Sequence, residues 1–192
     1  AILGAVVGPH GKVVAFDPNT RTSGLFHENI SLAGVSDRVE LREKAASDKK
    51  GKATLRVPLN WVGQATIQDR DFGSKPSFDL KVDTVTLESE LASFPRIDFL
   101  KVDVEGLEYR VLLGLGDMLE QRRLNVLCFA WDRGLLGEDL ESFQGLLRQW
   151  NTSYDAQFHW ILADGTLQNV PLDMLFETSS YPHVLMTHCW SS

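Results

Sequence analysis

Cysteine is scarce in this chain of 192 residues, which contains only Cys128 and Cys189. Two cysteines so far apart form no Cys-x-x-Cys pair and indicate no disulfide framework. The five histidines are scattered as well, at spacings that are not typical of a metal site. The sequence therefore predicts no metal site, and it favours a reducing compartment, the cytoplasm.

Long apolar runs and an excess of basic residues are also missing. The apolar start, residues 2–7, is too short to cross a bilayer, and no basic residue precedes it. Lys and Arg number 19 against 26 Asp and Glu, a net charge of -7, which argues against a nucleic acid as partner. With 43% hydrophobic residues, we expect residues 1–192 to form a single domain with one sizeable core.

Two apolar segments end in acidic residues. Residues 99–102 run into Asp103 and Glu105, and residues 13–16 run into Asp17. In open α/β sheets, ligands bind at the carboxyl ends of the strands. Two strands that both end in acids therefore predict a shared crevice.

Hydrophobic periodicity predicts the remaining elements. The inward side chains of a helix over 21–33 are expected to be Leu25, Ile30 and Leu32, and residues 49–52 are expected to form a hairpin-like turn. Asp164-Gly165 is a strong hairpin signal. Strands are predicted over 13–16, 39–43, 53–57, 80–85, 98–102, 126–131, 157–162, 166–170 and 184–187, and helices over 21–33, 88–92, 107–119 and 139–150.

The clearest helix covers residues 107–119. Leu107, Val111, Leu115 and Leu119 fall on one stripe at helical spacing, with Glu108 outside it. Arg110 also lies outside the stripe. We therefore expect the four apolar side chains to be buried.

Residues 58–77 fit no periodic element. A structureless stretch of that length in a compact domain is usually functional or mobile. We interpret it as a lid or a substrate loop.

The succession of these blocks resembles the FkbM-type family of S-adenosylmethionine-dependent methyltransferases. The resemblance implies an α/β fold with a Rossmann-like class I methyltransferase sheet, mostly parallel and ending in a C-terminal antiparallel hairpin. In such a sheet the first strand ends in a glycine-rich loop, whereas this chain opens on what resembles the helix after that loop. We therefore expect the domain to be N-terminally truncated, without its first strand and glycine loop. The matching residues are 11–19, 28–30, 39–47, Gly51, 82–87 and 97–106.

The resemblance implies S-adenosylmethionine as cofactor. Asp17 would bind both ribose hydroxyls, with Pro18 and Asn19 beside it, and Ala45 or Ala46 would border adenine. An alternative role for Asp17 is to cap the helix after Pro18. The same acid would also serve a nicotinamide cofactor.

Asp103 and Glu105 would face the methyl donor as candidate catalytic residues. Their carboxylates would hold the amino group of its methionine part, complement its sulfonium charge or orient the acceptor. Alternatively, Glu105 only occupies the amino end of the following helix, where the helix dipole favours an anion. His183, near the last strand, is a candidate general base toward an acceptor hydroxyl, and His188 is another. For Lys101 we expect a structural salt bridge.

The predicted function is methyl transfer from S-adenosylmethionine to a hydroxyl on a small molecule or sugar. One alternative is a non-catalytic binding or scaffold domain of the same fold. Another is a nicotinamide-linked oxidoreductase, for which the sequence shows no hydride-transfer constellation. The predicted partners are the acceptor molecule and, through the sheet exposed by the missing strand, a second copy of the chain; no nucleic acid or membrane is expected.

Overall fold

The computed structural model describes residues 1–59, 62–68 and 76–188. Within these ranges no helix is both long and apolar enough to cross a membrane. The strands are β1 (Val13–Phe16), β2 (Val39–Arg42), β3 (Ala45–Ala46), β4 (Gly51–Pro58), β5 (Ser77–Val85), β6 (Ile97–Val102), β7 (Leu124–Asp132), β8 (Ala156–Ile161), β9 (Leu167–Asn169) and β10 (Ser180–His188). The α-helices are α1 (Ile2–Val6), α2 (Ser23–Leu32), α3 (Leu87–Glu90), α4 (Glu108–Leu113), α5 (Arg133–Leu136), α6 (Leu140–Tyr154) and α7 (Leu172–Glu177), and short 3-10 helices cover Val62–Gln64, Gly116–Met118 and Gly137–Asp139.

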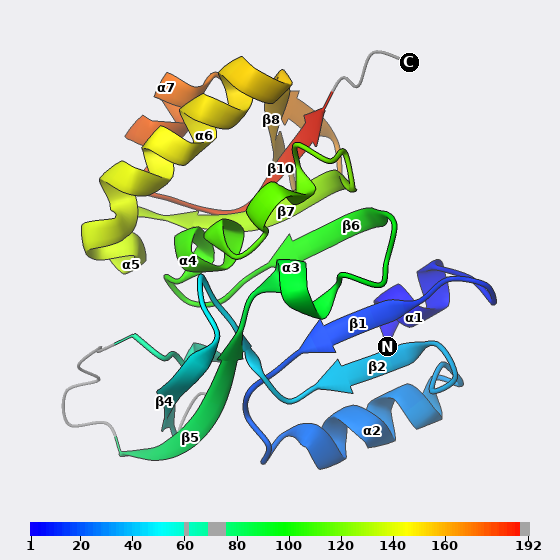
Figure 1. Ribbon diagram of the computed structural model, residues 1–192. Helices are drawn as coiled ribbons and strands as arrows, with labels where there is room; N and C mark the ends of the chain where they lie inside the picture. The colour runs from blue at the N-terminus through cyan, green and yellow to red at the C-terminus, as the bar shows by residue number, and fades with distance from the viewer. Residues whose placement is uncertain (60–61, 69–75, 189–192) are drawn as a thin grey trace.

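The strands form three hydrogen-bonded groups (Figure 1). The largest is a five-stranded sheet in the order β6-β7-β10-β8-β9, in which β6 and β7 are parallel and the other pairs antiparallel. Strands β1 and β2 form a parallel pair, and β3 and β4 flank β5. The α/β class, with parallel βα units followed by a C-terminal antiparallel hairpin, is therefore confirmed. The predicted hairpin is β8–β9, whose turn contains Gly165 at a φ of 83°.

The hairpin-like turn predicted for residues 49–52 is wrong. Strand β4 pairs antiparallel with β5, so that Gly51 lies opposite Thr84, and β3 pairs with the other edge of β5, where Ala45 lies opposite the same residue. The segments before and after the turn are therefore separated by β5 instead of pairing with each other. The long β4–β5 hairpin extends away from the five-stranded sheet (Figure 1).

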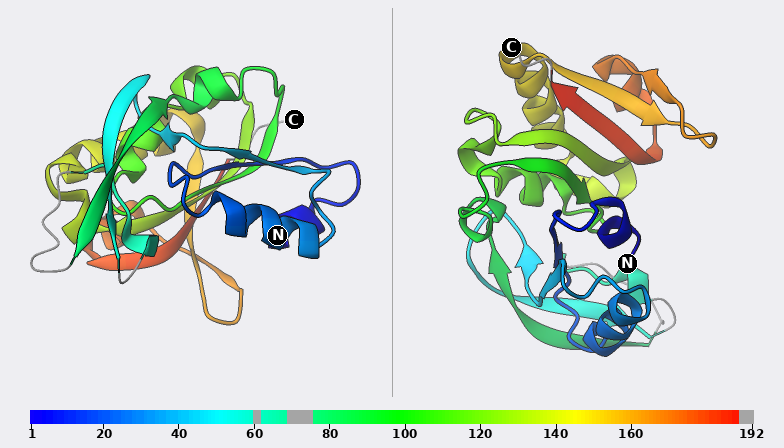
Figure 2. Two further views of the ribbon diagram at one scale, coloured as in Figure 1. Left: turned by 90° about the horizontal axis from the view of Figure 1, so that it is seen from below. Right: turned by 90° about the vertical axis from the view of Figure 1, so that its right-hand side faces the viewer.

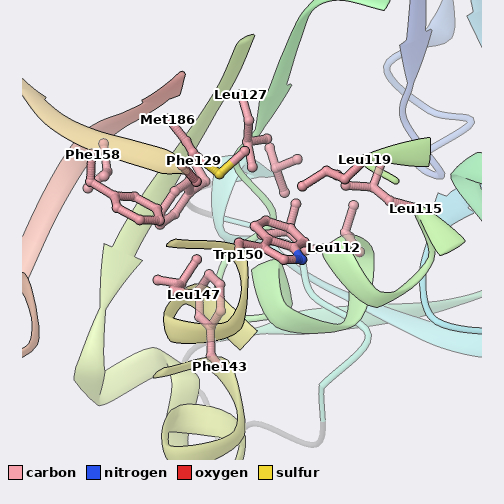
Figure 3. Packing of buried hydrophobic residues seen from close by; sticks show 14 of the residues in the cluster. Leu112, Leu115, Leu119, Leu127, Phe129, Phe143, Leu147, Trp150, Phe158 and Met186 are labelled. Atoms are coloured by element: carbon pink, nitrogen blue, oxygen red, sulfur yellow. The ribbon is translucent and has the colours of Figure 1, made fainter. Parts of the chain in front are cut away.

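The main core lies between the five-stranded sheet and helices α4 and α6 (Figure 3). The ring of Phe143 on α6 lies 5.5 Å from the ring of Phe129 and 5.7 Å from that of Trp131, both on β7. All three side chains are almost fully buried. Burying such a side chain contributes about 1.5–3 kcal/mol, so this layer is a principal source of stability.

The predicted helix over 107–119 is interrupted. Helix α4 ends at Leu113, and a 3-10 turn follows, entered through Gly116 at a φ of 52°. Gly114 lies so close to the preceding β3 region that a Cβ there would stand 2.1 Å from the carbonyl oxygen of Ser47. The predicted burial of Val111, Leu115 and Leu119 is confirmed, whereas Leu107, which precedes the helix and lines a cavity, is only half-buried.

Helix α2 buries only part of its expected apolar face. Ile30 is buried, as predicted, but Leu25 is 63% exposed and Leu32 is 80% exposed, so these two predictions are wrong. The helix packs in a small cluster with Val35 and Val39 of the β2 region. A two-stranded unit covers only a narrow stripe of the helix, and the other leucines remain at the surface.

Strands β1 and β6 both lie at sheet edges. Among the described residues β1 pairs only with β2 and β6 only with β7, although β1 and β6 point in the same direction in Figure 1. Figure 2 shows the β1–β2 unit and the five-stranded sheet from two further sides. On β6, the side chain of Phe99 is 44% exposed.

Candidate functional site

A cavity of about 320 Å³ lies where β1, β2 and β6 end. It is lined by Phe16, Asp17, Pro18, Lys44, Ala45, Ala46, Leu55, Gly63, Ala65, Thr66, Ile67, Asp103, Val104, Glu105 and Leu107. The structure thus brings together Asp17, Pro18, Ala45, Ala46, Asp103 and Glu105, which the sequence assigns to the site. The shared crevice expected for the two acid-ended strands is present.

Asp17 holds the turn that follows β1. Its Oδ1 accepts a hydrogen bond of 2.9 Å from the main-chain N–H of Asn19, and its Oδ2 accepts one of 2.9 Å from the Thr22 hydroxyl. The side chain therefore stabilises the turn between β1 and α2. The capping alternative is wrong in detail, because the N-cap of α2 is Thr22 and, among the described residues, no side chain accepts a hydrogen bond from the first helical N–H groups there. Each carboxylate oxygen accepts more than one hydrogen bond, so this local role leaves acceptor capacity for a ligand.

Asp103 is oriented by an ion pair on its own strand. Lys101 Nζ lies 2.5 Å from Asp103 Oδ2, which confirms the structural salt bridge predicted for Lys101. Glu105 follows with a φ of 55°, in the left-handed region that few non-glycine residues adopt. Gly106 has a φ of 98°, and a Cβ there would stand 2.6 Å from the carbonyl oxygen of Leu135. Only glycine fits this position without displacing the backbone.

Glu108 is the residue that sequence reasoning missed. It was expected outside the buried stripe, but its side chain is only 3% exposed. Its Oε1 accepts a hydrogen bond from Val104 N and its Oε2 one from Gly106 N, both of 3.1 Å. Burial raises the pKa of Glu108 above its ordinary value, and the negative charge of Asp103 adds to this rise. The available signal was an acidic residue in the first turn of a helix that follows a glycine turn.

Lys44 is the basic residue among the described lining. Its Nζ lies 2.8 Å from Glu90 Oε1, and Glu90 also pairs with Arg42. The lysine charge is therefore compensated by Glu90, and the charge of Asp103 by Lys101. Asp17 and Glu105 add two further carboxylates to the lining. Such an arrangement favours a ligand that carries positive charge.

Part of the predicted substrate loop lies at the cavity. Thr66 is buried, exchanges main-chain hydrogen bonds of 2.9 and 3.1 Å with Arg56, and lines the wall beside Ile67. Gln68 Nε2 donates to the carbonyl oxygens of Gly106, at 3.4 Å, and Leu135, at 3.3 Å. Residues 60–61 and 69–75 of this loop lie outside the described residues.

Comparison with known proteins agrees with this geometry. Residues 2–155 match the family model described as the methyltransferase FkbM domain. The chain belongs to the FkbM methyltransferase family. "Methyltransferase 1" of Beauveria bassiana (strain ARSEF 2860) is 27% identical to the FkbM chain over 127 residues, which cover 57% of this chain and 51% of that protein. The chain thus spans about half the length of this curated relative.

Among solved structures, a precorrin 8w decarboxylase from Methanobacterium thermoautotrophicum is similar to the FkbM chain. The two have 15% sequence identity and a TM-score of 0.42. The alignment covers 96% of this chain and 73% of that one.

Three residues assigned to the site from the sequence of the FkbM domain, Asn19, His183 and His188, lie outside the described cavity lining. Asn19 is buried behind Asp17, where its Oδ1 accepts a hydrogen bond of 3.2 Å from Arg21 N. His183 is exposed in the irregular part of β10, where the pairing register with β7 shifts. No group of three potential metal ligands occurs among the described residues, and Cys189 lies beyond them.

Proposed function

We propose that this FkbM domain binds S-adenosylmethionine in the cavity, and that the protein transfers the methyl group to a hydroxyl oxygen of a small molecule or sugar in the cytoplasm. The observation that carries the proposal is that Asp17, Asp103 and Glu105 line one cavity, in which the single lysine of the described lining is already paired with Glu90. S-adenosylmethionine carries a sulfonium and an ammonium group, which carboxylates stabilise. A nicotinamide dinucleotide carries an anionic pyrophosphate instead, which calls for N–H donors at a helix start.

The residues present fit the nucleoside part of this cofactor. Asp17 offers two acceptor oxygens to a ribose, and Pro18 shapes the wall beside it. Ala45 and Ala46 keep the wall after β2 small enough for a flat ring to approach. Asp103 faces the same space from the end of β6, on the side we assign to the methyl donor.

When bound, the cofactor supplies a methyl group on an electrophilic sulfonium centre. The protein then has two tasks: to hold an acceptor hydroxyl in line with that methyl group, and to accept the hydroxyl proton. We assign the second task to Asp103 or Glu105, because both line the cavity and His183 lies outside its described wall. Positioning supplies much of the acceleration in a displacement of this kind.

Calorimetric titration tests the proposal. We expect S-adenosylhomocysteine to bind the folded chain and NADH not to bind. S-adenosylhomocysteine lacks the sulfonium charge but keeps the ammonium group, so Asp103→Asn should weaken its binding about tenfold, which corresponds to about 1.4 kcal/mol. The matched control is Asp98→Asn on the same strand, since Asp98 pairs with Arg96 and does not line the cavity. A folded chain that binds neither ligand would contradict the proposal and support a scaffold role, and selective binding of NADH would support an oxidoreductase.

A further inference from the structure

The turn 104–106 follows β6 and Asp103, and it contains Glu105, which lines the cavity as Asp103 does. Within it, Glu105 and Gly106 both have positive φ values, of 55° and 98°. For a residue with a side chain such as Glu105 this backbone conformation is unfavourable, and it persists only where the surrounding structure holds it. The described contacts show which groups hold this turn.

One carboxylate binds both ends of the turn from the protein interior. Glu108 accepts the N–H of Val104 with one oxygen and the N–H of Gly106 with the other, so that Glu105 lies between two anchored residues. The side chain is buried, and its own helix starts at the same residue. A carboxylate is acceptor-only, so it satisfies two N–H groups at once, which a neutral amide cannot do with both its terminal atoms.

The loop 62–68 holds the same turn through a separate contact. Gln68 Nε2 donates to the carbonyl oxygen of Gly106 and to that of Leu135 at the start of α5. This contact acts on a carbonyl group, whereas Glu108 acts on the N–H groups. Among the described side chains, Glu108 thus binds the N–H groups on both sides of Glu105.

We propose that Glu108 is a positioning residue: its carboxylate fixes the turn 104–106 and thereby sets Asp103, Glu105 and Leu107 at the cavity wall. Glu108 does not line the cavity itself, so it acts on a ligand only through these residues. The effect on ligand affinity rests on the proposed function. The effect on the turn does not, and can be measured without a ligand.

The test compares Glu108→Gln, which preserves the side-chain volume, with Glu88→Gln as a matched control. Glu88 also accepts a main-chain N–H, that of Asp117 at 3.3 Å, and lies away from the cavity lining. In Glu108→Gln we expect hydrogen exchange at the amides of Val104 and Gly106 to become about tenfold faster or more, because one N–H then faces an amide donor. The helical amide of Val111 should stay unchanged.

Two further readouts complete the test. In a crystal structure of Glu108→Gln we expect Glu105 to leave the left-handed region and Asp103 to shift from the wall. We also expect the affinity for S-adenosylhomocysteine to fall about tenfold, and Glu88→Gln should leave it unchanged. A variant that keeps the wild-type turn and the wild-type affinity would overturn the proposal.

The proposal and the proposed function fail in different ways. If the wild type is folded and binds no S-adenosylhomocysteine, the proposed function fails. The positioning role of Glu108 is then tested only by the conformation and hydrogen exchange of the turn 104–106 in Glu108→Gln. If Glu108→Gln does not fold, hydrogen exchange in the wild type tests the positioning role instead. Amides of Val104 and Gly106 that exchange as slowly as Val111 support the proposal, and exchange at the rate of an unstructured peptide overturns it.

Discussion

Asp17 and Asp103 line the same cavity, although they follow two strands, β1 and β6, that are not paired with each other among the described residues. Asp17 is fixed by the turn that leads into α2, and Asp103 by its ion pair with Lys101. Each acid is therefore oriented by its own strand end. The cavity is defined by how these two strand ends are placed.

Two substitutions at Asp17 separate its proposed ligand role from its role in holding the turn before α2. Asparagine keeps an oxygen for Asn19 N and offers Nδ2 to the Thr22 hydroxyl, which also bonds to the carbonyl oxygen of Asn19 at 2.7 Å. We expect Asp17→Asn to melt near the wild-type temperature but to bind S-adenosylhomocysteine about tenfold more weakly. Asp17→Ala should lose both affinity and about 0.5–1.5 kcal/mol of unfolding free energy, because the N–H of Asn19 loses its acceptor.

Calorimetric titration and thermal unfolding measure these two effects. The control is Asp37→Asn, which removes an exposed carboxylate paired with Arg38, away from the described cavity lining. Wild-type affinity in both Asp17 variants would mean that the residue only stabilises the turn before α2.

A pair of glycine substitutions tests the packing of α4 against the β3 region. Gly114→Ala places a Cβ 2.1 Å from the carbonyl oxygen of Ser47, so the main chain must shift. We expect it to lower the unfolding free energy by about 1–3 kcal/mol, the usual cost of overpacking. Gly145→Ala, in α6, meets no atom within 4 Å and should raise it by about 0.5–1 kcal/mol through helix propensity. Urea unfolding measures the free energy of unfolding of both variants. Equal changes in this free energy would show that the close approach at Gly114 does not occur.

Because Glu108 is buried, the free energy of unfolding is expected to depend on pH in a specific direction. Its pKa is raised above the ordinary value of 4.5, so the folded state holds this proton at pH values where the unfolded state has lost it. The contribution of Glu108 is therefore largest below the ordinary pKa and is lost as the pH rises through the raised pKa.

The measurement is urea unfolding of the wild type and Glu108→Gln between about pH 4 and pH 8. The difference in unfolding free energy, wild type minus variant, should fall as the pH rises, by no more than about 1.4 kcal/mol per pH unit. A difference that rises with pH would show that the hydrogen bonds from Val104 and Gly106 outweigh burial and hold the pKa of Glu108 low.

The sequence predicted which residues line the cavity better than it predicted which side chains of the surrounding helices are buried. The grouping of Asp17 with Asp103 followed from the rule that ligands bind at the carboxyl ends of strands, and it holds although β1 and β6 belong to different hydrogen-bonded groups among the described residues. Exposure of Leu25 and Leu32 could not be predicted, because periodicity gives the apolar face of a helix but not how much neighbouring structure covers it.

Glu108 and the path of β4 were missed for a different reason. A periodic pattern describes side chains of one element, whereas the burial of Glu108 depends on two N–H groups of the preceding turn that need an acceptor. Likewise β5, which lies between β3 and β4, comes later in the chain. A local turn signal at residues 49–52 carries no information about a strand that arrives afterwards.

The edges of β1 and β6 predict self-association of the isolated chain. Each has a parallel partner on one side only among the described residues, and the side chain of Phe99 on β6 is exposed. Open strand edges pair with other chains unless charge or coverage prevents it. We expect sedimentation velocity to show dimers or larger species for the wild type and a shift toward monomer for Phe99→Lys. Leu32→Lys, on the exposed side of α2, is the control and should not change the distribution. A purely monomeric wild type would contradict this prediction.

Amide NMR of the isotope-labelled chain, titrated with S-adenosylhomocysteine, tests whether the cavity at the ends of β1 and β6 is the cofactor site. We predict saturable shifts at Asp17, Ala46 and Asp103, with little change at Gly165 in the β8–β9 turn or at Leu175 on α7. Shifts confined to residues away from the cavity, or no saturable shift in a folded chain, would contradict this assignment of the site.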